Sequence, residues 1–322
     1  MVKNLKDLMT KFQDEAACRE FLVQQRWNGV PECPYCGCRK SYKIEAGKRF
    51  KCANSGCYKK YSVTVGTIFE ASNIPLTTWF AAMYLITAHK KGISSVQLAK
   101  DLGVTQKTGW FMLHRIRESL KENAPLLLQK EVQADEIYIG GQEANKHKDR
   151  RAKNQQEASE NKMPIVGIIE TGGRVVTQVM PWITKRNITD LILQHVDRKA
   201  TLVTDGLPAY QKVGKKYEHI VINHSEGQFK VGKHHTNGIE NYWSLLSRGI
   251  YGIYHQVSDK HLQRYCDEFA YRFNSRTFSD GFRWALTFHQ IEGRLTYKTL
   301  IANGKDQKNE GGYPIEIIET GE

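Results

Sequence analysis

The sequence predicts an α/β domain with a mixed central sheet, preceded by a cysteine-rich module and a helical segment. Five of the seven cysteines fall between Cys33 and Cys57. Apolar residues then recur at helical spacing up to about residue 120, and short strand-like runs alternate with helical ones from residue 131. This order is typical of a sheet flanked by helices. We expect four regions, namely 1–70, 71–125, 126–300 and a C-terminal tail, 301–322.

The composition indicates a polyanionic partner. Lys and Arg number 47 against 34 Asp and Glu, which gives a net charge of +13 and a pI near 9.3. Such an excess favours nucleic acid. The longest apolar run, Trp79–Ala88, is far shorter than the roughly 18 residues of a membrane span. The N-terminus mixes charges without a signal-peptide core. We expect a cytoplasmic protein that associates with the nucleoid when bound to DNA, and no membrane contact.

The cysteine spacing predicts a zinc ribbon after an N-terminal helix. Two residues separate the first pair and four separate the second, and the segment between them reads as a hairpin turning near Ala46-Gly47. Two such knuckles can bring four thiolates into a tetrahedron that suits Zn²⁺. A reducing compartment favours metal over disulfides. Cys38 could replace one ligand, and inert buried cysteines are the alternative. The predicted zinc ligands are Cys33, Cys36, Cys52 and Cys57.

Residues 94–119 have the pattern of a helix-turn-helix. Ser94 or Ser95 can cap a first helix, Gly103 makes a turn, and Thr105 can cap a second helix. In DNA-binding proteins of this geometry the second helix enters the major groove with its N-terminus first. A plain helical hairpin would give the same pattern, but the basic charge and the cysteine module favour DNA. The predicted DNA contacts here are Gln106, Lys107, Thr108 and Arg115.

The region 126–300 reads as strands and helices in alternation. "EVQADEIYIGG" is a strand, 142–162 a basic flexible loop, and "MPIVGIIETGGRVVTQVMPW" a hairpin around 171–173. A short helix, a buried strand ending at Asp205 and another strand follow. Helices interrupted by a glycine-rich break begin near Asn237.

Three carboxylates in this region are candidate metal ligands. Asp135 lies near the end of one buried strand, Asp205 ends another, and Glu240 lies near a helix start. Adjacent strand ends gather side chains into one crevice. Carboxylates held together there need hard cations such as Mg²⁺, and two ions about 4 Å apart can act on a phosphodiester. Singly, Asp205 could cap a turn and Glu240 could complement a helix dipole. Alternation along the strand predicts that Glu136 points to the opposite face.

Several longer blocks resemble a known family. "GTIFE", "KKGISSVQLAKDLGVTQKTGWFMLHRIRE", "DEIYIGG", "VTDGLPAY", "VINHSEG" and "HTNGIENYWSLLSRGIYGIYHQVSDKHLQRYCDEFAYRFN" are similar to bacterial insertion-sequence DDE transposases. These enzymes place a zinc ribbon before a ribonuclease H-like catalytic domain and are related to Merlin transposases. The 34 residues between Asp205 and Glu240 match the spacing of the third acid in many of them. The resemblance covers about residues 15–280.

The resemblance implies roles for individual residues. Asp135 is the first catalytic acid, Asp205 the second and Glu240 the third, with Asn237 as the alternative because parts of the family place asparagine there. Relatives often carry a lysine seven residues after the third position. Here Ser247 occupies that place, and the neighbouring Arg248 is expected to contact the DNA backbone. An aromatic-rich stretch at this helix start could line the site or belong to the core, and its residues are His234, His235 and Trp243.

The resemblance also implies an activity. We expect an enzyme that binds terminal inverted repeats, cleaves their 3′ ends with Mg²⁺ or Mn²⁺ and joins them to target DNA, as a homodimer or larger assembly on double-stranded DNA. Two alternatives stay open, a non-catalytic DNA-binding regulator and a structure-selective nuclease of the same fold. The block from His235 to Gly252 favours the transposase by resemblance.

Overall fold

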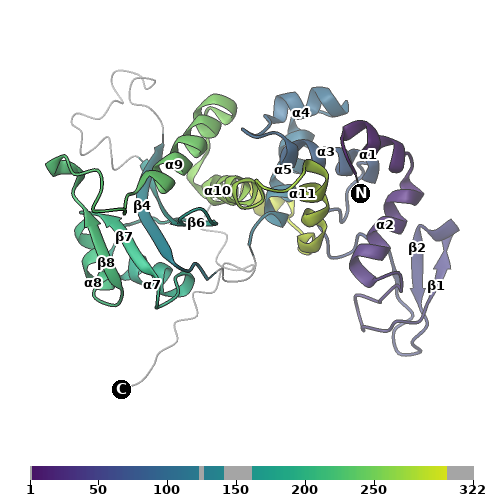
Figure 1. Ribbon diagram of the computed structural model, residues 1–322. Coiled ribbons are helices and arrows are strands. Elements are labelled where there is room, and N and C mark those ends of the chain that lie inside the picture. Colours follow the sequence, from purple (N-terminus) through teal and green to yellow (C-terminus); the bar gives the residue numbers. More distant parts are fainter. Residues whose placement is uncertain (1, 123–126, 141–161, 303–322) are drawn as a thin grey trace.

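The computed structural model describes residues 2–122, 127–140 and 162–302. The predicted basic loop, apart from Lys162, and almost all of the predicted tail lie outside these residues. The molecule is elongated, with the larger sheet at one end, a helical region in the middle and the cysteine-rich module at the other end (Figure 1). No helix in the described ranges combines the length and the apolar character that crossing a membrane requires.

The N-terminal region consists of two helices and a small antiparallel sheet. Asn4 and Asp14 cap the two helices with their side chains. The predicted hairpin is confirmed, and it turns through Ala46 and Gly47, both at positive φ. The elements are α1 (Leu5–Lys11), α2 (Glu15–Trp27), β1 (Ser41–Ile44), η1 (Glu45–Gly47), β2 (Arg49–Cys52) and β3 (Lys60–Tyr61).

The middle region is built from α3 (Leu76–Ala88), α4 (Ser95–Leu102) and α5 (Gln106–Ser119). The predicted caps are confirmed, since the hydroxyls of Ser94 and Thr105 accept from the first turns of α4 and α5. Gly103 makes the turn between them at φ 64°. Later segments join this core, because Trp284 of α11 (Asp280–Leu286) and Phe288 of η7 (Thr287–Gln290) pack on Phe80.

The predicted mixed sheet is confirmed, with five strands in the order β6-β5-β4-β7-β8. The central strand β4 pairs antiparallel with β5 and parallel with β7, so the sheet is mixed. The predicted hairpin is β5 and β6. The strands are β4 (Glu131–Gly140), β5 (Lys162–Glu170), β6 (Val175–Val179), β7 (Thr201–Asp205) and β8 (Glu218–Ile222).

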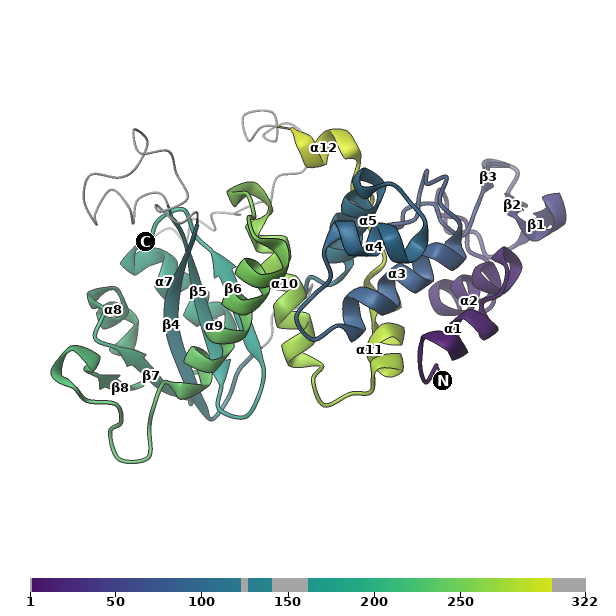
Figure 2. The same cartoon turned by 90° about the horizontal axis from the view of Figure 1, so that it is seen from above.

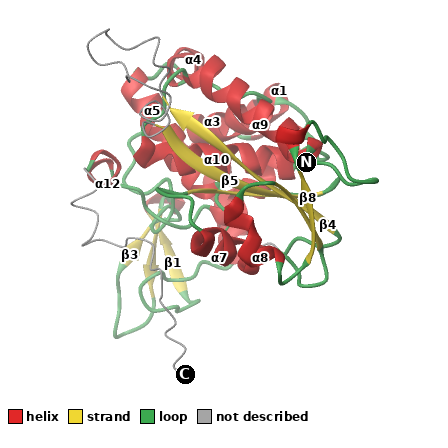
Figure 3. Ribbon diagram, turned by 90° about the vertical axis from the view of Figure 1, so that its left-hand side faces the viewer, coloured by secondary structure: helices red, strands yellow, loops and turns green. Residues whose placement is uncertain are grey.

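Helices cover both faces of this sheet (Figures 2 and 3). One face of the sheet packs on the helix that follows the β5–β6 hairpin and on two short helical segments. The other face packs on two longer helices. The first group is α7 (Lys185–His195), η4 (Pro208–Tyr210) and α8 (Gln211–Gly214). The second is α9 (Asn237–Gly249) and α10 (Asp259–Asn274). The remaining short elements are η5 (His224–Glu226), η6 (Ile250–Tyr254) and α12 (Tyr297–Ile301).

A buried ionic cluster joins the helical region to the sheet domain. Glu268 of α10 is fully buried between Arg117 of α5 and Arg272. The Arg117 Nε donates to Glu268 at 2.6 Å, and the Tyr254 hydroxyl donates to the same carboxylate. Arg272 also donates to the carbonyl of Ile86 on α3. The contacts tie α5 and α3 to the sheet domain through α10.

Candidate active site and metal centres

Three carboxylates meet at the edge of the central sheet. One oxygen each from Asp135, Glu136 and Asp205 lies within 4.8 Å of the others. The parallel pairing of β4 with β7 ends at Ala134 and Thr204, so Asp135 and Asp205 follow side by side. The sequence prediction that these two acids come together is thereby confirmed.

The prediction that Glu136 points to the opposite sheet face from Asp135 is confirmed, and yet the Glu136 carboxylate also belongs to the cluster. The Cβ positions do alternate, since the Trp243 indole donates to Asp135 at 3.1 Å and the Tyr210 hydroxyl donates to Glu136 at 3.2 Å from a different element. However, β4 continues beyond its last pair with β7, and among the described residues no strand pairs with it on that side there. Beyond that last pair, the carboxylates of Asp135 and Glu136 both lie near that of Asp205. Strand alternation alone could not reveal this, because it ignores where the pairing stops.

The cluster raises the pKa of two of its members. Burial raises the pKa of Asp135 to about 6, and the charges of Asp205 and Glu240 add to the effect. Burial also raises the pKa of Glu136 to about 7, together with the charges of Asp205 and Asp135. The neighbouring charges that produce these shifts are all carboxylates. Oxygen ligands held close together under mutual repulsion are what a hard divalent cation would stabilise.

Glu240 lies beside this cluster rather than in it. Its carboxylate accepts from the Thr236 hydroxyl at 2.7 Å and is half exposed in the first turn of α9. Among the described residues it is not a member of the group whose oxygens lie within 4.8 Å. Its charge still raises the pKa of Asp135, so it faces the same region. Asn237 is exposed one turn earlier. The choice between them stays a prediction.

A row of polar side chains on β4 fixes the position of α9. Glu131, Gln133 and Asp135 alternate along one face of the strand, and each binds the segment that leads into α9 or α9 itself. The contacts are Glu131 with His234 Nδ1 at 2.6 Å, Gln133 with the Ile239 N–H at 3.0 Å and Asp135 with Trp243 Nε1 at 3.1 Å. The sequence left open whether these aromatic residues line the site or belong to the core, and Trp243 does both, since it is buried in the core and donates to Asp135. The sequence signal for this row was the polar residues alternating with Val132 and Ala134.

Gly238 is required by the same contact. A Cβ at this position would lie 2.7 Å from the Gln133 side-chain oxygen, which is too close for a real atom. Gln133 is fully buried and also donates to Thr171 at 3.2 Å, so it cannot easily move aside. The close approach of Gly238 to β4 therefore sets how far the first turn of α9 lies from the carboxylates.

The residues predicted to contact DNA have different surroundings. Gln106 and Lys107 are exposed at the start of α5, where Gln106 donates to Ser95 at 2.9 Å and Lys107 lies over the Tyr297 ring. Thr108 is partly buried. Arg248 is exposed near the end of α9.

Arg115 does not lie on that surface, which corrects the prediction for this residue. It is buried, and its guanidinium donates to the Glu70 carbonyl at 2.7 Å. The same group packs over the rings of Trp79 and Phe111. Burial lowers its pKa to about 10. Arg115 therefore holds α5 against α3 and the preceding loop, and it is not available to DNA in this structure.

The four predicted cysteine ligands converge in the N-terminal module. Sulfurs of Cys33, Cys36, Cys52 and Cys57 lie within 4.8 Å of one another. Cys33 and Cys57 are 3.8 Å apart and Cys36 and Cys52 3.5 Å apart. A tetrahedral zinc site with Zn–S bonds of about 2.3 Å places its sulfurs about 3.8 Å apart. The Cys38 thiol instead turns to the Lys40 carbonyl and is not in the group.

Comparisons with known proteins agree with both sites. Residues 127–274 match the family model of the ISXO2-like transposase domain, and residues 13–60 match that of the transposase zinc-ribbon domain. The carboxylate cluster lies in the first segment and the four cysteines in the second. No curated protein matches the chain.

A search of solved structures found weaker likenesses. One is the cryo-EM structure of a simian T-cell lymphotropic virus intasome in complex with PP2A regulatory subunit B56 gamma, at 14% identity and a TM-score of 0.27. The match covers 57% of this chain and 66% of that chain, just under two thirds of its length. A TM-score of this size does not establish a shared fold.

Proposed function

The chain belongs to the insertion-sequence transposases with an N-terminal zinc ribbon, and we propose that it cleaves the 3′ ends of an insertion sequence and joins them to target DNA. The strand order, with β4 central and flanked by an antiparallel and a parallel neighbour, supports a ribonuclease H-like catalytic domain. Terminal inverted repeats and target DNA are the proposed substrates, and the proposed working form is a homodimer or a larger assembly on DNA.

The observation that carries the proposal is the cluster of Asp135, Glu136 and Asp205 at the sheet edge. These carboxylates would hold Mg²⁺ or Mn²⁺, with Glu240 or Asn237 completing the set. When bound, such ions would favour ionisation of the attacking group and stabilise charge on the leaving oxygen. The chain's own contribution is orientation, since Trp243 fixes the carboxylate of Asp135 and Tyr210 that of Glu136.

The proposed chemistry has two steps at phosphorus. Water attacks a phosphodiester at the element end, a new P–O bond forms, and the bond to the 3′ oxygen breaks to leave a 3′-hydroxyl. That hydroxyl then attacks a phosphodiester of the target, forms the joined strand and releases a target 3′-hydroxyl. Phosphodiesters react very slowly unaided, so alignment and charge stabilisation must provide most of the acceleration.

The remaining parts would bind DNA and hold the module together. We assign structural Zn²⁺ to the four cysteines, whose donor set and spacing suit it. The helices α4 and α5 would act as a helix-turn-helix, with Gln106, Lys107 and Thr108 at the entering end. Arg248 would contact the DNA backbone near the site.

Strand transfer on labelled element-end DNA with Mg²⁺ or Mn²⁺ tests this function. Wild type should join DNA only with metal, and Glu240→Gln should abolish joining while Asn237→Ala keeps it. Loss in Asn237→Ala alone would make the asparagine the third residue. Metal-independent binding without joining would contradict the proposal and indicate a regulator, and cleavage of branched DNA without joining would indicate a nuclease.

A further inference from the structure

The outer face of the small N-terminal sheet carries an unbalanced row of basic and aromatic side chains. Tyr42 pairs across the strands with Lys51, and Lys51 pairs with Lys60, so one row crosses β1, β2 and β3. All three side chains are exposed. The opposite face carries Phe50 and Tyr61, which are buried against Trp27. The sheet therefore has one structural face and one free face.

The free face places like charges next to each other. Lysines directly opposite on neighbouring strands repel and destabilise a sheet, and Lys51 and Lys60 are such a pair. From Cys33 to Ser62 the sequence has eight Lys and Arg but one acid, Glu45, whose carboxylate lies 3.6 Å from Arg49. Within the described part of the chain, no carboxylate forms an ion pair with Lys51, Lys59 or Lys60. An anionic partner would relieve this repulsion.

Aromatic side chains accompany these lysines instead of joining the core. Tyr35, Tyr42 and Tyr58 are 50%, 57% and 55% exposed. The Lys59 ammonium lies 4.6 Å from the centre of the Tyr35 ring, and that of Lys51 lies 5.5 Å from the centre of the Tyr58 ring. Such contacts keep the ammonium groups on the surface and limit their freedom. Lysines held among tyrosines that can donate hydrogen bonds form a surface suited to phosphates.

We propose that this surface, the ribbon face, binds the phosphate backbone of duplex DNA. The ribbon face consists of Tyr42, Lys51, Tyr58 and Lys60 on the outer side of the sheet, together with the exposed pair of Tyr35 and Lys59 beside it. The inference rests on the proposed function for its choice of DNA. Phosphate contacts position a protein without reading sequence, so the ribbon face supplies affinity and register while α5 reads bases.

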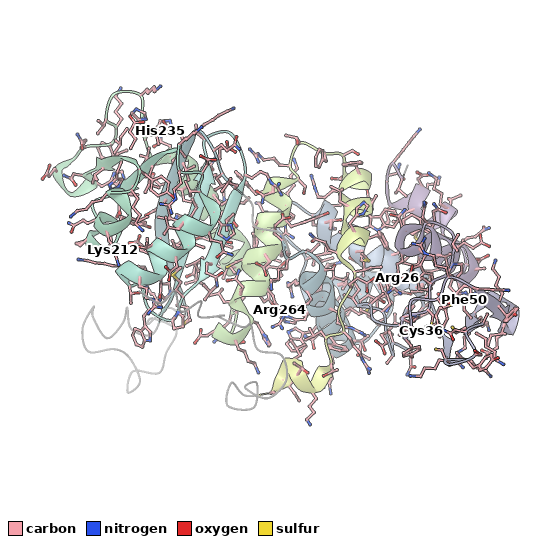
Figure 4. The ribbon with its side chains drawn as sticks, turned by 90° about the horizontal axis from the view of Figure 1, so that it is seen from below. Arg26, Cys36, Phe50, Lys212, His235 and Arg264 are labelled. Carbon is pink, nitrogen blue, oxygen red and sulfur yellow. The ribbon has the colours of Figure 1, made fainter. Side chains whose placement is uncertain are left out.

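The location of the ribbon face indicates an extended duplex. The small sheet lies at the opposite end of the molecule from the carboxylate cluster (Figure 1). Figure 4 shows the same separation, with Cys36 and Phe50 at one end and His235, just before α9, at the other. A single DNA that reaches both the ribbon face and the catalytic edge must run along the helical region between them. The ribbon face therefore contacts DNA at a distance from the cleaved phosphodiester.

The test is equilibrium binding of the full-length protein to fluorescent element-end duplex over a range of salt concentrations. Changing Lys51, Lys59 and Lys60 together to Gln should weaken binding roughly 10- to 100-fold and lower the salt slope by about 2 to 3. A matched control removes three exposed lysines at the other end of the molecule, Lys212, Lys215 and Lys216, and should change affinity much less. Zinc content, measured by release to a chelating dye, should equal that of wild type.

Two outcomes would overturn the proposal. One is wild-type affinity and salt slope in the Gln variant with zinc retained. The other is an equal loss in a variant with Arg at the same three positions, because Arg keeps the charge and should preserve binding. If wild type binds through the ribbon face but never joins DNA, the proposed function fails while this inference stands. If joining is metal-dependent and the ribbon variants bind normally, only this inference fails.

Discussion

Two clusters of buried charged side chains in this molecule differ in whether opposite charges accompany them. Glu268 at the junction of the helical region and the sheet domain lies between two arginines. Burial alone would raise its pKa, but the charges of Arg272 and Arg117 hold the pKa below its ordinary value. At the sheet edge, burial and neighbouring carboxylates raise the pKa of Asp135 and Glu136.

The difference separates a structural charge from a functional one. In the junction cluster the chain itself supplies the opposite charge, since two arginines surround the single carboxylate of Glu268. The carboxylate cluster has charges of one sign, and the raised pKa values show that the fold disfavours their ionised forms. A group of closely spaced acids whose pKa values are raised by burial and mutual repulsion is suited to bind cations from solution.

The largest expected effect is loss of activity on removing one carboxylate. Asp205→Asn should lower metal-dependent DNA joining by about 1,000-fold or more, because an amide is a poor ligand for a hard cation. The fold should remain, since the change relieves repulsion. A matched control is Asp190→Asn, an exposed acid on α7 that lies 3.8 Å from Arg186, which should retain joining within about twofold. Joining by Asp205→Asn at the wild-type rate would remove the carboxylate cluster from the chemistry.

The next effect is on stability at the junction. Glu268→Gln should lower the free energy of unfolding by about 3–5 kcal/mol, because it leaves two buried arginines without their counter-charge. Urea denaturation measures this. The control Glu118→Gln removes a partly exposed partner of Arg264 and should cost less than about 1 kcal/mol. Equal small losses in both variants would show that the buried cluster is not specially dependent on its acid.

A smaller effect tests how α9 is positioned. Gly238→Ala should slow DNA joining roughly tenfold, because the added methyl group meets the Gln133 amide and displaces the first turn of α9. The control Gly252→Ala has open space at its Cβ position and should join normally. In a Gln133→Ala background the same Gly238→Ala change should do less harm. Additive losses in the double variant would argue against this contact.

The smallest effect concerns pH in the absence of divalent metal. The folded pKa values of about 6 and 7 for Asp135 and Glu136 exceed the ordinary values of 3.8 and 4.5 for these side chains. The native state therefore binds more protons than the unfolded state between about pH 4 and 7, and its stability falls as pH rises through this range. Glu136→Gln should be more stable than wild type at pH 8 by on the order of 1 kcal/mol, allowing for partial exposure.

That advantage should disappear by about pH 4, where wild-type Glu136 is protonated in both the folded and the unfolded state. Urea melts of both proteins at pH 8 and near pH 4 measure the difference. A constant difference between the two proteins across pH would contradict the raised pKa.

Local patterns in the sequence predicted the parts of the site that depend on local structure. Cysteine spacing predicted the four converging thiolates, and strand ends placed Asp135 beside Asp205. The sequence did not predict that Glu136 joins the cluster, because that depends on where the pairing of β4 with β7 ends, which is a property of the sheet. Arg115 was misassigned because helix position alone does not show that α3 covers it. The docking of α11 on α3 joins segments about 200 residues apart, and no local pattern encodes that contact.

The most direct test of the central claim is calorimetric titration of Mn²⁺ into zinc-loaded protein at pH 8, with element-end DNA bound. Wild type should bind Mn²⁺, and Asp205→Asn should bind it at least tenfold more weakly, because the cluster then lacks one of its carboxylates. Near pH 6 the wild-type affinity should fall as Asp135 and Glu136 take up protons. Identical Mn²⁺ binding by the two proteins, or none by wild type, would contradict the assignment of the carboxylate cluster as the metal site.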